Sequence, residues 1–124
     1  MYIDRLVSDF LEIVPELKEG YENRKNCDLI SDNDGYYIHW GIGLMPEILE
    51  LFRDFESNQA VLDRVFKFFE KMANSDEEIK ELLIYGILEN LGDQKEILEQ
   101  SWPLMGATTF NLSKSVECFL GRNG

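Results

Sequence analysis

Histidine, cysteine, proline and basic residues are all scarce in this sequence of 124 residues. It contains 1 histidine, 2 cysteines, 3 prolines and only 12 lysine or arginine residues against 24 aspartate or glutamate residues. The net charge of −12 excludes binding to the phosphates of nucleic acids and to anionic membranes, because both need clustered basic side chains. The longest apolar run extends only from Leu82 to Leu88, whereas a membrane span needs roughly 18 apolar residues.

The single histidine, His39, and the two cysteines, Cys27 and Cys118, leave little material for metal or nucleophilic chemistry. The sequence has no Cys-x-x-Cys, His-Glu-x-x-His or Gly-x-Ser-x-Gly motif. The N-terminus has neither the basic segment nor the uncharged apolar stretch of an export signal, so we expect a cytoplasmic protein with free thiols. We therefore predict a protein that is not an enzyme, with no catalytic, metal-binding or cofactor-binding residues.

Two fragments of known binding motifs fail on their spacing. If Gly35 stood at position six of a calcium loop, Ile30 would occupy the first ligand position and Gly41 would replace the bidentate glutamate. Gly41 and Gly43 begin a dinucleotide fingerprint, but Pro46 stands where its third glycine belongs. Both fragments are interpreted as turns or loops.

Apolar residues recur with helical spacing over most of the chain, starting with Ile3, Leu6, Val7, Phe10 and Leu11. Proline can begin a helix and glycine can end one, and these residues divide the pattern into segments. Including their caps, helices are expected at about 3–14, 15–24, 46–55, 58–74, 75–92, 93–101 and 108–121.

Three N-caps are predicted, at Asn58, at Ser75 in a capping box with Glu78, and at Asp93. The run 82–88 is apolar on every side, which predicts a central buried helix, and Gly86 would allow a neighbouring helix to approach closely. The fold class is therefore all-α: an irregular bundle of about six to seven helices in one domain spanning 1–124. Two helical pairs, 46–74 and 76–105, fall short of the three repeats expected of a solenoid.

Residues 26–43 break the helical pattern. Turn formers at 32–35 precede a group of aromatic residues, which predicts a loop or a short extended excursion and no substantial sheet. No lysine or arginine occurs between Asn26 and Phe52. Carboxylates beside aromatic rings favour binding of a basic protein partner. The rings can be buried in the interface, and the negative charges attract the partner during association. The candidate partner-binding residues are Asp28, Asp32, Asp34, Tyr36, Tyr37, His39, Trp40, Glu47 and Glu50. The alternative is that Tyr37 and Trp40 fill the core and the acids only keep the loop soluble.

Much of the chain outside 26–42 resembles a small bacterial family of uncharacterised acidic helical domains. The resemblance is carried by Ala73–Ile79, Leu88–Asp93, Leu104-Met105-Gly106, Thr109, Leu112-Ser113-Lys114, Val116-Glu117 and Phe119-Leu120-Gly121, together with Phe10-Leu11, Pro15–Lys18 and Tyr21. These are caps, core residues and helix stops, so the resemblance implies a helical fold and no catalytic residues.

The overall profile is also similar in kind to bacterial toxin-immunity proteins, which are short, cytoplasmic, acidic and without a catalytic centre. This likeness implies a protein that neutralises a cognate cationic toxin, for example a nuclease, by direct binding. Two alternatives stay open. One is a helical adaptor or regulatory domain that binds a protein or peptide in a groove between helices. The other is an enzyme with a pocket that gathers Glu89, Tyr85 and His39. The sequence leaves the oligomeric state open.

Overall fold

The computed structural model describes residues 1–122, which contain no strand. Helical elements of three kinds follow one another along the chain, with α-helices interrupted by 3₁₀ turns (η1, η2, η4, η6) and by two π-helical segments (η3, η5). In chain order they are η1 (Ile3–Arg5), α1 (Leu6–Ile13), η2 (Pro15–Leu17), α2 (Lys18–Asn26), α3 (Tyr36–Ile38), η3 (His39–Leu44), α4 (Met45–Leu51), η4 (Phe52–Asp54), α5 (Gln59–Ala73), α6 (Glu77–Glu81), η5 (Leu82–Leu88), α7 (Glu89–Leu91), α8 (Lys95–Ser101), η6 (Trp102–Leu104) and α9 (Ala107–Phe119).

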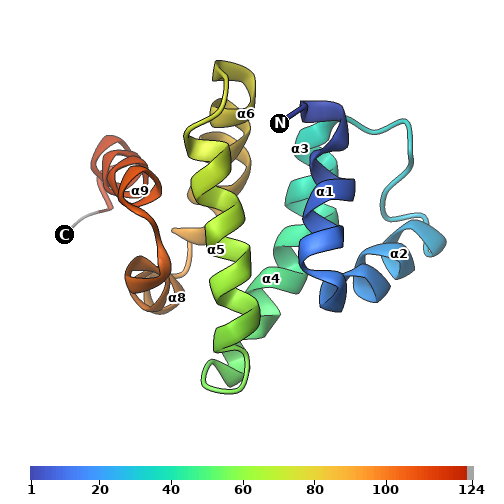
Figure 1. Cartoon of the computed structure of the whole chain (residues 1–124), viewed down its shortest axis with the longest axis horizontal. Helices are drawn as coiled ribbons and strands as arrows, with labels where there is room; N and C mark the ends of the chain where they lie inside the picture. Colours follow the sequence, from blue (N-terminus) through green and yellow to red (C-terminus); the bar gives the residue numbers. More distant parts are fainter. Residues whose placement is uncertain (123–124) are drawn as a thin grey trace.

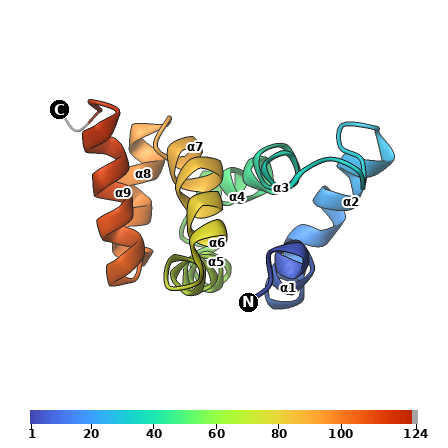
Figure 2. The same ribbon diagram turned by 90° about the horizontal axis from the view of Figure 1, so that it is seen from above.

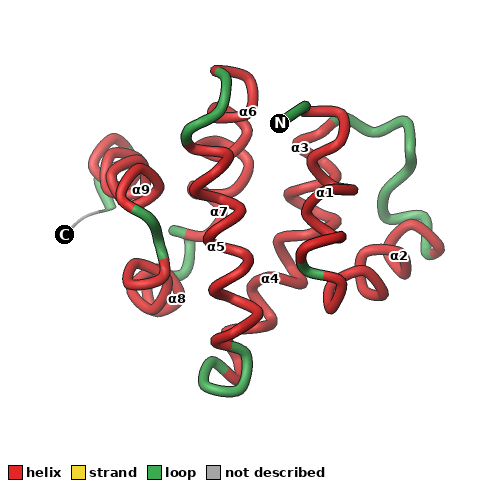
Figure 3. The backbone as a smooth tube through the Cα atoms, viewed as in Figure 1, coloured by secondary structure: helices red, strands yellow, loops and turns green. Residues whose placement is uncertain are grey.

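Within the described residues these elements join into seven continuous helical stretches, so the expected all-α fold is confirmed. Helix α5 runs through the middle of the molecule, with the stretch α6–η5–α7 beside it (Figures 1 and 2). Helices α8 and α9 lie on one side of this centre, and α1, α3 and α4 lie on the other. The long axis therefore runs from α9 at one end to α2 and the loop that follows it at the other (Figure 3).

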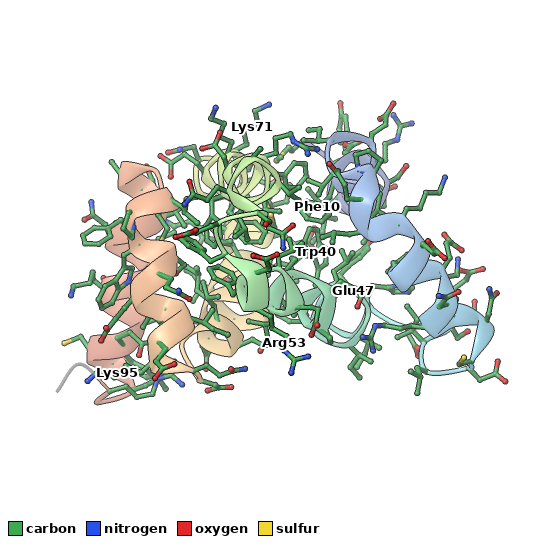
Figure 4. The ribbon with its side chains drawn as sticks, turned by 90° about the horizontal axis from the view of Figure 1, so that it is seen from below. Phe10, Trp40, Glu47, Arg53, Lys71 and Lys95 are labelled. Atoms are coloured by element: carbon green, nitrogen blue, oxygen red, sulfur yellow. The ribbon has the colours of Figure 1, made fainter. Side chains whose placement is uncertain are left out.

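The core is built on the predicted apolar stripe of α5. Leu62, Val65, Phe66, Phe69 and Met72 are all fully buried. Phe69 and its neighbour Phe68 pack against Phe10 of α1 and Trp40 of η3, and the Phe10 and Trp40 ring centroids are 5.1 Å apart. In Figure 4, Phe10 and Trp40 lie in the interior, while Lys71 and Lys95 point outward. Each such buried side chain contributes about 1.5–3 kcal/mol through the removal of apolar surface from water.

Residues 36–43 are helical, which corrects the expected loop or extended excursion. The helix begins at Tyr36, directly after Gly35 in extended backbone, and the loop is confined to 27–35. The physical reason is a stripe in helical spacing, Trp40, Leu44 and Ile48, of which every member is fully buried. Burial of this stripe outweighs the local preference of the aromatic and glycine residues for other conformations.

The two π-helical segments, η3 and η5, pack against one another. The adjoining helix α3 also approaches η5 closely at Gly86, where a Cβ atom would lie 3.2 Å from the Tyr37 ring, which confirms the close approach expected at this glycine. The expectation that 82–88 is buried on every side is only partly met. Leu82, Leu83, Ile87 and Leu88 are buried, but Tyr85 is exposed. None of the helices in residues 1–122 has both the length and the apolar character to cross a membrane.

Two predicted N-caps are displaced by one residue. Asp76, not Ser75, caps α6, because its Oδ1 accepts from the backbone N–H of Ile79 at 3.0 Å, while the Ser75 hydroxyl donates to the carbonyl of Lys71. The N-cap position of α8 is Gln94, and the carboxylate of Asp93 instead pairs with Arg122. Neighbouring polar residues can compete for the same orphan amides, so sequence alone does not rank them.

A third cap, at Asn58, stands at its predicted position, but its side chain makes no capping hydrogen bond to its helix. Its side-chain amide donates to the carbonyl of Leu51 at 3.0 Å and so ties the turn before α5 to the end of α4. The helix α9 also starts earlier than predicted, at Ala107, with Gly106 as N-cap.

The first turn of α9 is capped by a side chain from another helix. The Glu70 carboxylate of α5 accepts from the backbone N–H groups of Thr109 (2.8 Å) and Thr108 (3.2 Å) and from the Thr109 hydroxyl (2.7 Å). Partial burial alone would raise the pKa of Glu70, but these hydrogen bonds, led by the one from Thr109, outweigh it and hold the pKa below its usual value. Glu70 therefore favours the charged state in the folded protein.

Replacing Glu70 with alanine is expected to lower the free energy of unfolding at pH 7 by about 1–2 kcal/mol, the usual effect of losing an N-cap. Because the folded-state pKa is lowered, the contribution of Glu70 is fully present above its ordinary value of 4.5 and is lost as the pH falls through the folded-state value. Urea unfolding of wild type and Glu70→Ala at pH 7 and at about pH 3 measures both effects. The exposed Glu99→Ala is the control and should show no comparable pH-dependent difference. Equal stability of Glu70→Ala and wild type at pH 7 would contradict the cap.

Candidate functional site

A concavity of about 670 Å³, which we call the acidic groove, lies between α1, the η2–α2 segment and the 27–35 loop with the start of α3. Hydrophobic side chains of α1, among them Val7 and Leu11, form part of its wall. Five carboxylates and one ammonium group line it, namely Asp4, Glu12, Glu22, Asp32, Asp34 and Lys18. The charge of this lining is strongly negative, and its geometry suits a cationic side chain whose aliphatic stem can lie on the apolar wall.

A hydrogen-bonded pair joins α2 to η3 inside the acidic groove. The Tyr21 hydroxyl lies 2.7 Å from Nδ1 of His39. Burial raises the pKa of the Tyr21 phenol, against an opposing effect of Lys25, so the hydroxyl keeps its proton and can donate to the imidazole. This bond fixes α2, which lines the acidic groove, relative to the helical stretch that begins at Tyr36.

The loop 27–35 is held in place by its own acids. Asp32 pairs with Lys25 at 2.7 Å, and the hydrogen bond from that ammonium lowers the pKa of the Asp32 carboxyl. Asp34 accepts from the backbone N–H of Ser31 at 2.8 Å. Asp28 adopts a positive φ of 59°, in the left-handed region that aspartate tolerates better than most residues. The loop therefore presents fixed carboxylates at the groove.

The structure brings four of the nine sequence-predicted residues together in the acidic groove: Asp32, Asp34, Tyr36 and His39. The Tyr36 side chain is 40% exposed there. Asp28 and Tyr37 are exposed but do not line the groove, and Tyr37 instead covers Gly86.

Two further candidates on α4 are engaged with arginines. Glu47 pairs with Arg24 of α2 at 3.2 Å and lies over Gly20, and Figure 4 shows it on the α4 side of the molecule. Glu50 is exposed and pairs with Arg53 at 3.1 Å. Glu47 is therefore part of the contact between α2 and α4, and neither residue lines the acidic groove.

Trp40 does not belong to any surface, which corrects its place among the candidates. It is fully buried (0% exposed) against Phe10 and Phe68, as the alternative interpretation of the sequence expected for this residue. Its indole N–H has no hydrogen-bond partner among the described residues. The reason is the helical register from Tyr36 onward, which turns Trp40 inward while Tyr36 and Tyr37 stay at the surface.

The first two helical stretches contribute to the groove in a way that the sequence pattern did not indicate. Asp4, Ser8 and Glu12 line it from α1 and the turn before it, and Glu22 lines it from α2. The spacing of four residues between Asp4, Ser8 and Glu12 places them on one helical face, and this was the available signal. Which loop that face would meet depends on the tertiary arrangement.

The three residues named for the alternative of an enzyme pocket are not gathered in one place. His39 lines the acidic groove, whereas Tyr85 and Glu89 line a separate apolar hollow beside α9. Across residues 1–122 there is no group of three or more histidine, cysteine, aspartate or glutamate side chains arranged to hold a metal ion. Cys27 and Cys118 are both exposed free thiols, as expected.

One buried acid that the sequence did not single out is structural. Glu117 of α9 is almost completely buried and pairs with Arg122 at 2.7 Å. Arg122 also pairs with Asp93 at 2.6 Å and donates to the carbonyl of Glu89 at 3.2 Å. These contacts tie the end of α9 to α7 and to the turn before α8, away from the acidic groove.

A family model described as a domain of unknown function (DUF7674) matches residues 7–121. No curated protein and no solved structure matches the chain.

Proposed function

Because this chain belongs to the DUF7674 family, whose function is unknown, we propose its function from its own surface: it binds a basic protein partner through the acidic groove. More specifically, we propose a bacterial immunity protein in the cytoplasm that neutralises a cognate cationic toxin domain. The observation that carries the proposal is the concentration of five carboxylates around the acidic groove.

The charge distribution favours rapid encounter with such a partner. Residues 1–62, which contain the groove, carry 13 acidic and 5 basic residues, whereas 63–124 carry 11 and 7. Like charges that line a concave surface focus the electrostatic potential and raise association rates by about 10- to 1,000-fold. The chain thus attracts a cation toward the end of the molecule where the groove lies.

The groove also offers contacts that hold a cationic side chain after encounter. A lysine or arginine stem can pack against Val7, Leu11 and the exposed Tyr36 ring while its charge meets the carboxylates. A nuclease toxin binds phosphate through basic residues, so the carboxylates of the groove would occupy those residues in place of the substrate. The mechanism of neutralisation is then direct obstruction of the toxin's binding site.

We expect the triple variant Asp4→Asn, Glu12→Gln, Glu22→Gln to associate about tenfold more slowly with the candidate partner, for which we would test the purified product of the adjacent gene. Within residues 1–122 the side chains of these three residues make no hydrogen bond or ion pair, so the fold should be unaffected. Their replacement removes only the electrostatic attraction that steers the partner. Stopped-flow association rates at about 50 mM and about 500 mM NaCl measure the effect, and the wild-type rate should fall steeply with salt.

The matched control is Glu56→Gln, Glu81→Gln, Glu96→Gln, which removes the same charge from exposed positions outside the groove. It should slow association less than twofold at about 50 mM NaCl, since only long-range charge is lost. Equal slowing by both variants would place the binding surface elsewhere. Absence of binding, or a rate independent of salt, would instead favour the adaptor alternative with an uncharged partner.

A further inference from the structure

A second surface, separate from the acidic groove, lies where the stretch α6–η5–α7 passes between α3 and α9 (Figure 2). Tyr37 of α3 is 48% exposed, Tyr85 of η5 is 59% exposed and Phe119 of α9 is 87% exposed. The Tyr37 ring lies over Gly86, the neighbour of Tyr85 in the chain. Tyr85 and Phe119 in turn line an apolar hollow of about 170 Å³ between η5–α7 and α9. We call these three rings and the hollow the aromatic surface, and exposed rings beside a hollow are typical of an interaction site.

Carboxylates lie at both ends of the aromatic surface. Glu78 and Glu81 are exposed about two turns and one turn before Tyr85, and Glu89 lines the hollow one turn after it. Burial raises the pKa of the Tyr37 phenol, and the negative charges of Glu81 and Glu78 add to this effect, so both carboxylates lie near the ring. Within residues 1–122 none of these three carboxylates makes a hydrogen bond or an ion pair, and no lysine or arginine lines the hollow.

The backbone beneath the aromatic surface is also unusual. The π-helical segments η3 and η5 pack against one another here, and π-helical turns occur frequently at functional sites. The lining of the hollow follows α9 from Leu112 to Phe119, which is about two helical turns. A hollow of this length can receive two side chains that stand one turn apart on a bound helix.

We propose that the aromatic surface binds an amphipathic helix of a partner protein, with its apolar side chains in the hollow and its flanking arginines on Glu81 and Glu89. Charge complementarity selects this occupant, because the unpaired carboxylates at both ends of the surface attract basic side chains. Arginine suits the surface better than lysine, since a guanidinium group can stack on the Tyr85 ring and donate to a carboxylate at the same time.

A second copy of this chain fits the surface poorly, because at −12 it would be repelled by the same carboxylates. None of the residues of the aromatic surface lines the acidic groove, so the inference does not depend on the proposed function.

Fluorescence anisotropy of a labelled peptide with the full chain tests the proposal. The probe is an amphipathic helical peptide of about 18 residues, with leucines on one face and arginines along its flanks. Tyr85→Ala and Phe119→Ser should each weaken binding at least about tenfold. Their circular dichroism and urea unfolding should match wild type, because both rings are exposed. The double variant Glu81→Gln, Glu89→Gln should weaken binding about threefold at about 50 mM NaCl and reduce its dependence on salt.

The control for general attraction to an acidic chain is the groove variant Asp4→Asn, Glu12→Gln, Glu22→Gln. It removes three charges outside the aromatic surface and should change the affinity less than about twofold. Two matched peptides complete the test, one with serine in place of leucine and one with glutamate in place of arginine, and both should bind at least about tenfold more weakly.

Absence of binding to the wild-type chain, or equal binding of the glutamate peptide, overturns the proposal. Weaker binding to the groove variant, with Tyr85→Ala and Phe119→Ser at the wild-type affinity, overturns it as well. Sedimentation equilibrium covers the remaining occupant: a chain that self-associates through Phe119 and excludes the peptide would assign the surface to a second copy. None of these results changes the expected effect of the groove variant on the partner of the acidic groove, so the two proposals fail separately.

Discussion

Replacing Trp40 with alanine is expected to lower the free energy of unfolding by about 3–5 kcal/mol. The indole is fully buried, and its ring contacts Phe10, Phe68 and Phe69 with centroid distances of 5.1, 6.4 and 6.4 Å. Alanine removes these contacts and leaves a cavity where α1 meets α5. Domains of this kind have total stabilities of about 5–15 kcal/mol, so a large part of the stability depends on this one side chain. Urea unfolding followed by circular dichroism measures the loss.

Tyr36→Ala is the matched comparison for Trp40→Ala. Both residues are aromatic and lie in the same helical stretch, but Tyr36 is 40% exposed in the acidic groove. Its replacement should cost less than about 1 kcal/mol of stability. Similar losses for the two variants would show that Trp40 does not fill the core in solution.

Gly43→Ala should lower the free energy of unfolding by about 2 kcal/mol, whereas Gly41→Ala should raise it by about 0.5–1 kcal/mol. Glycine normally weakens a helix relative to alanine by about that amount, and nothing lies within 4 Å of a Cβ atom at Gly41. At Gly43 the new Cβ would lie 2.9 Å from the Tyr21 ring and 3.0 Å from Ile30, so both must shift in a packed interior.

The Gly43 clash also reaches the acidic groove, because Tyr21 carries the hydrogen bond to His39. The NMR signal of the His39 ring should therefore move in Gly43→Ala and stay near its wild-type position in Gly41→Ala. Urea unfolding of the two variants supplies the stability comparison. If Gly43→Ala proved as stable as Gly41→Ala, the close contact between η3 and Tyr21 would be wrong.

Much of the helical framework was predictable, because strong periodicity makes local and tertiary preferences agree. The stripe of α5 is an example, since its apolar residues face the core: Val61 is partly buried, and Leu62, Val65, Phe66, Phe69 and Met72 are fully buried. Residues 36–43 show the opposite case. Their aromatic and glycine content suggested a loop, and the helix was visible only in the wider spacing that relates Trp40 to Leu44 and Ile48. The cap of α9 by Glu70 could not be predicted, because it joins residues far apart in the sequence.

The candidate site was predictable only where its residues are neighbours in sequence. Asp32, Asp34, Tyr36 and His39 come from one short segment, and the structure keeps them together. The opposite wall, with Asp4, Glu12 and Glu22, comes from helices that meet this segment only after folding. Trp40 was grouped with its neighbours because sequence proximity does not reveal which side of a helix faces inward.

The π-helical segment His39–Leu44 makes the surface around the acidic groove tolerant of a one-residue change in chain length. A π-helical turn, with its i→i+5 hydrogen bonds, holds about one residue more than an α-helical turn. Losing one residue from this segment would convert it into a regular α-helical turn and leave the residues on either side near their present orientation. Tyr36 would stay at the groove and Tyr37 would stay over Gly86. A relative with one residue fewer here would thus present the same binding surface on the same core.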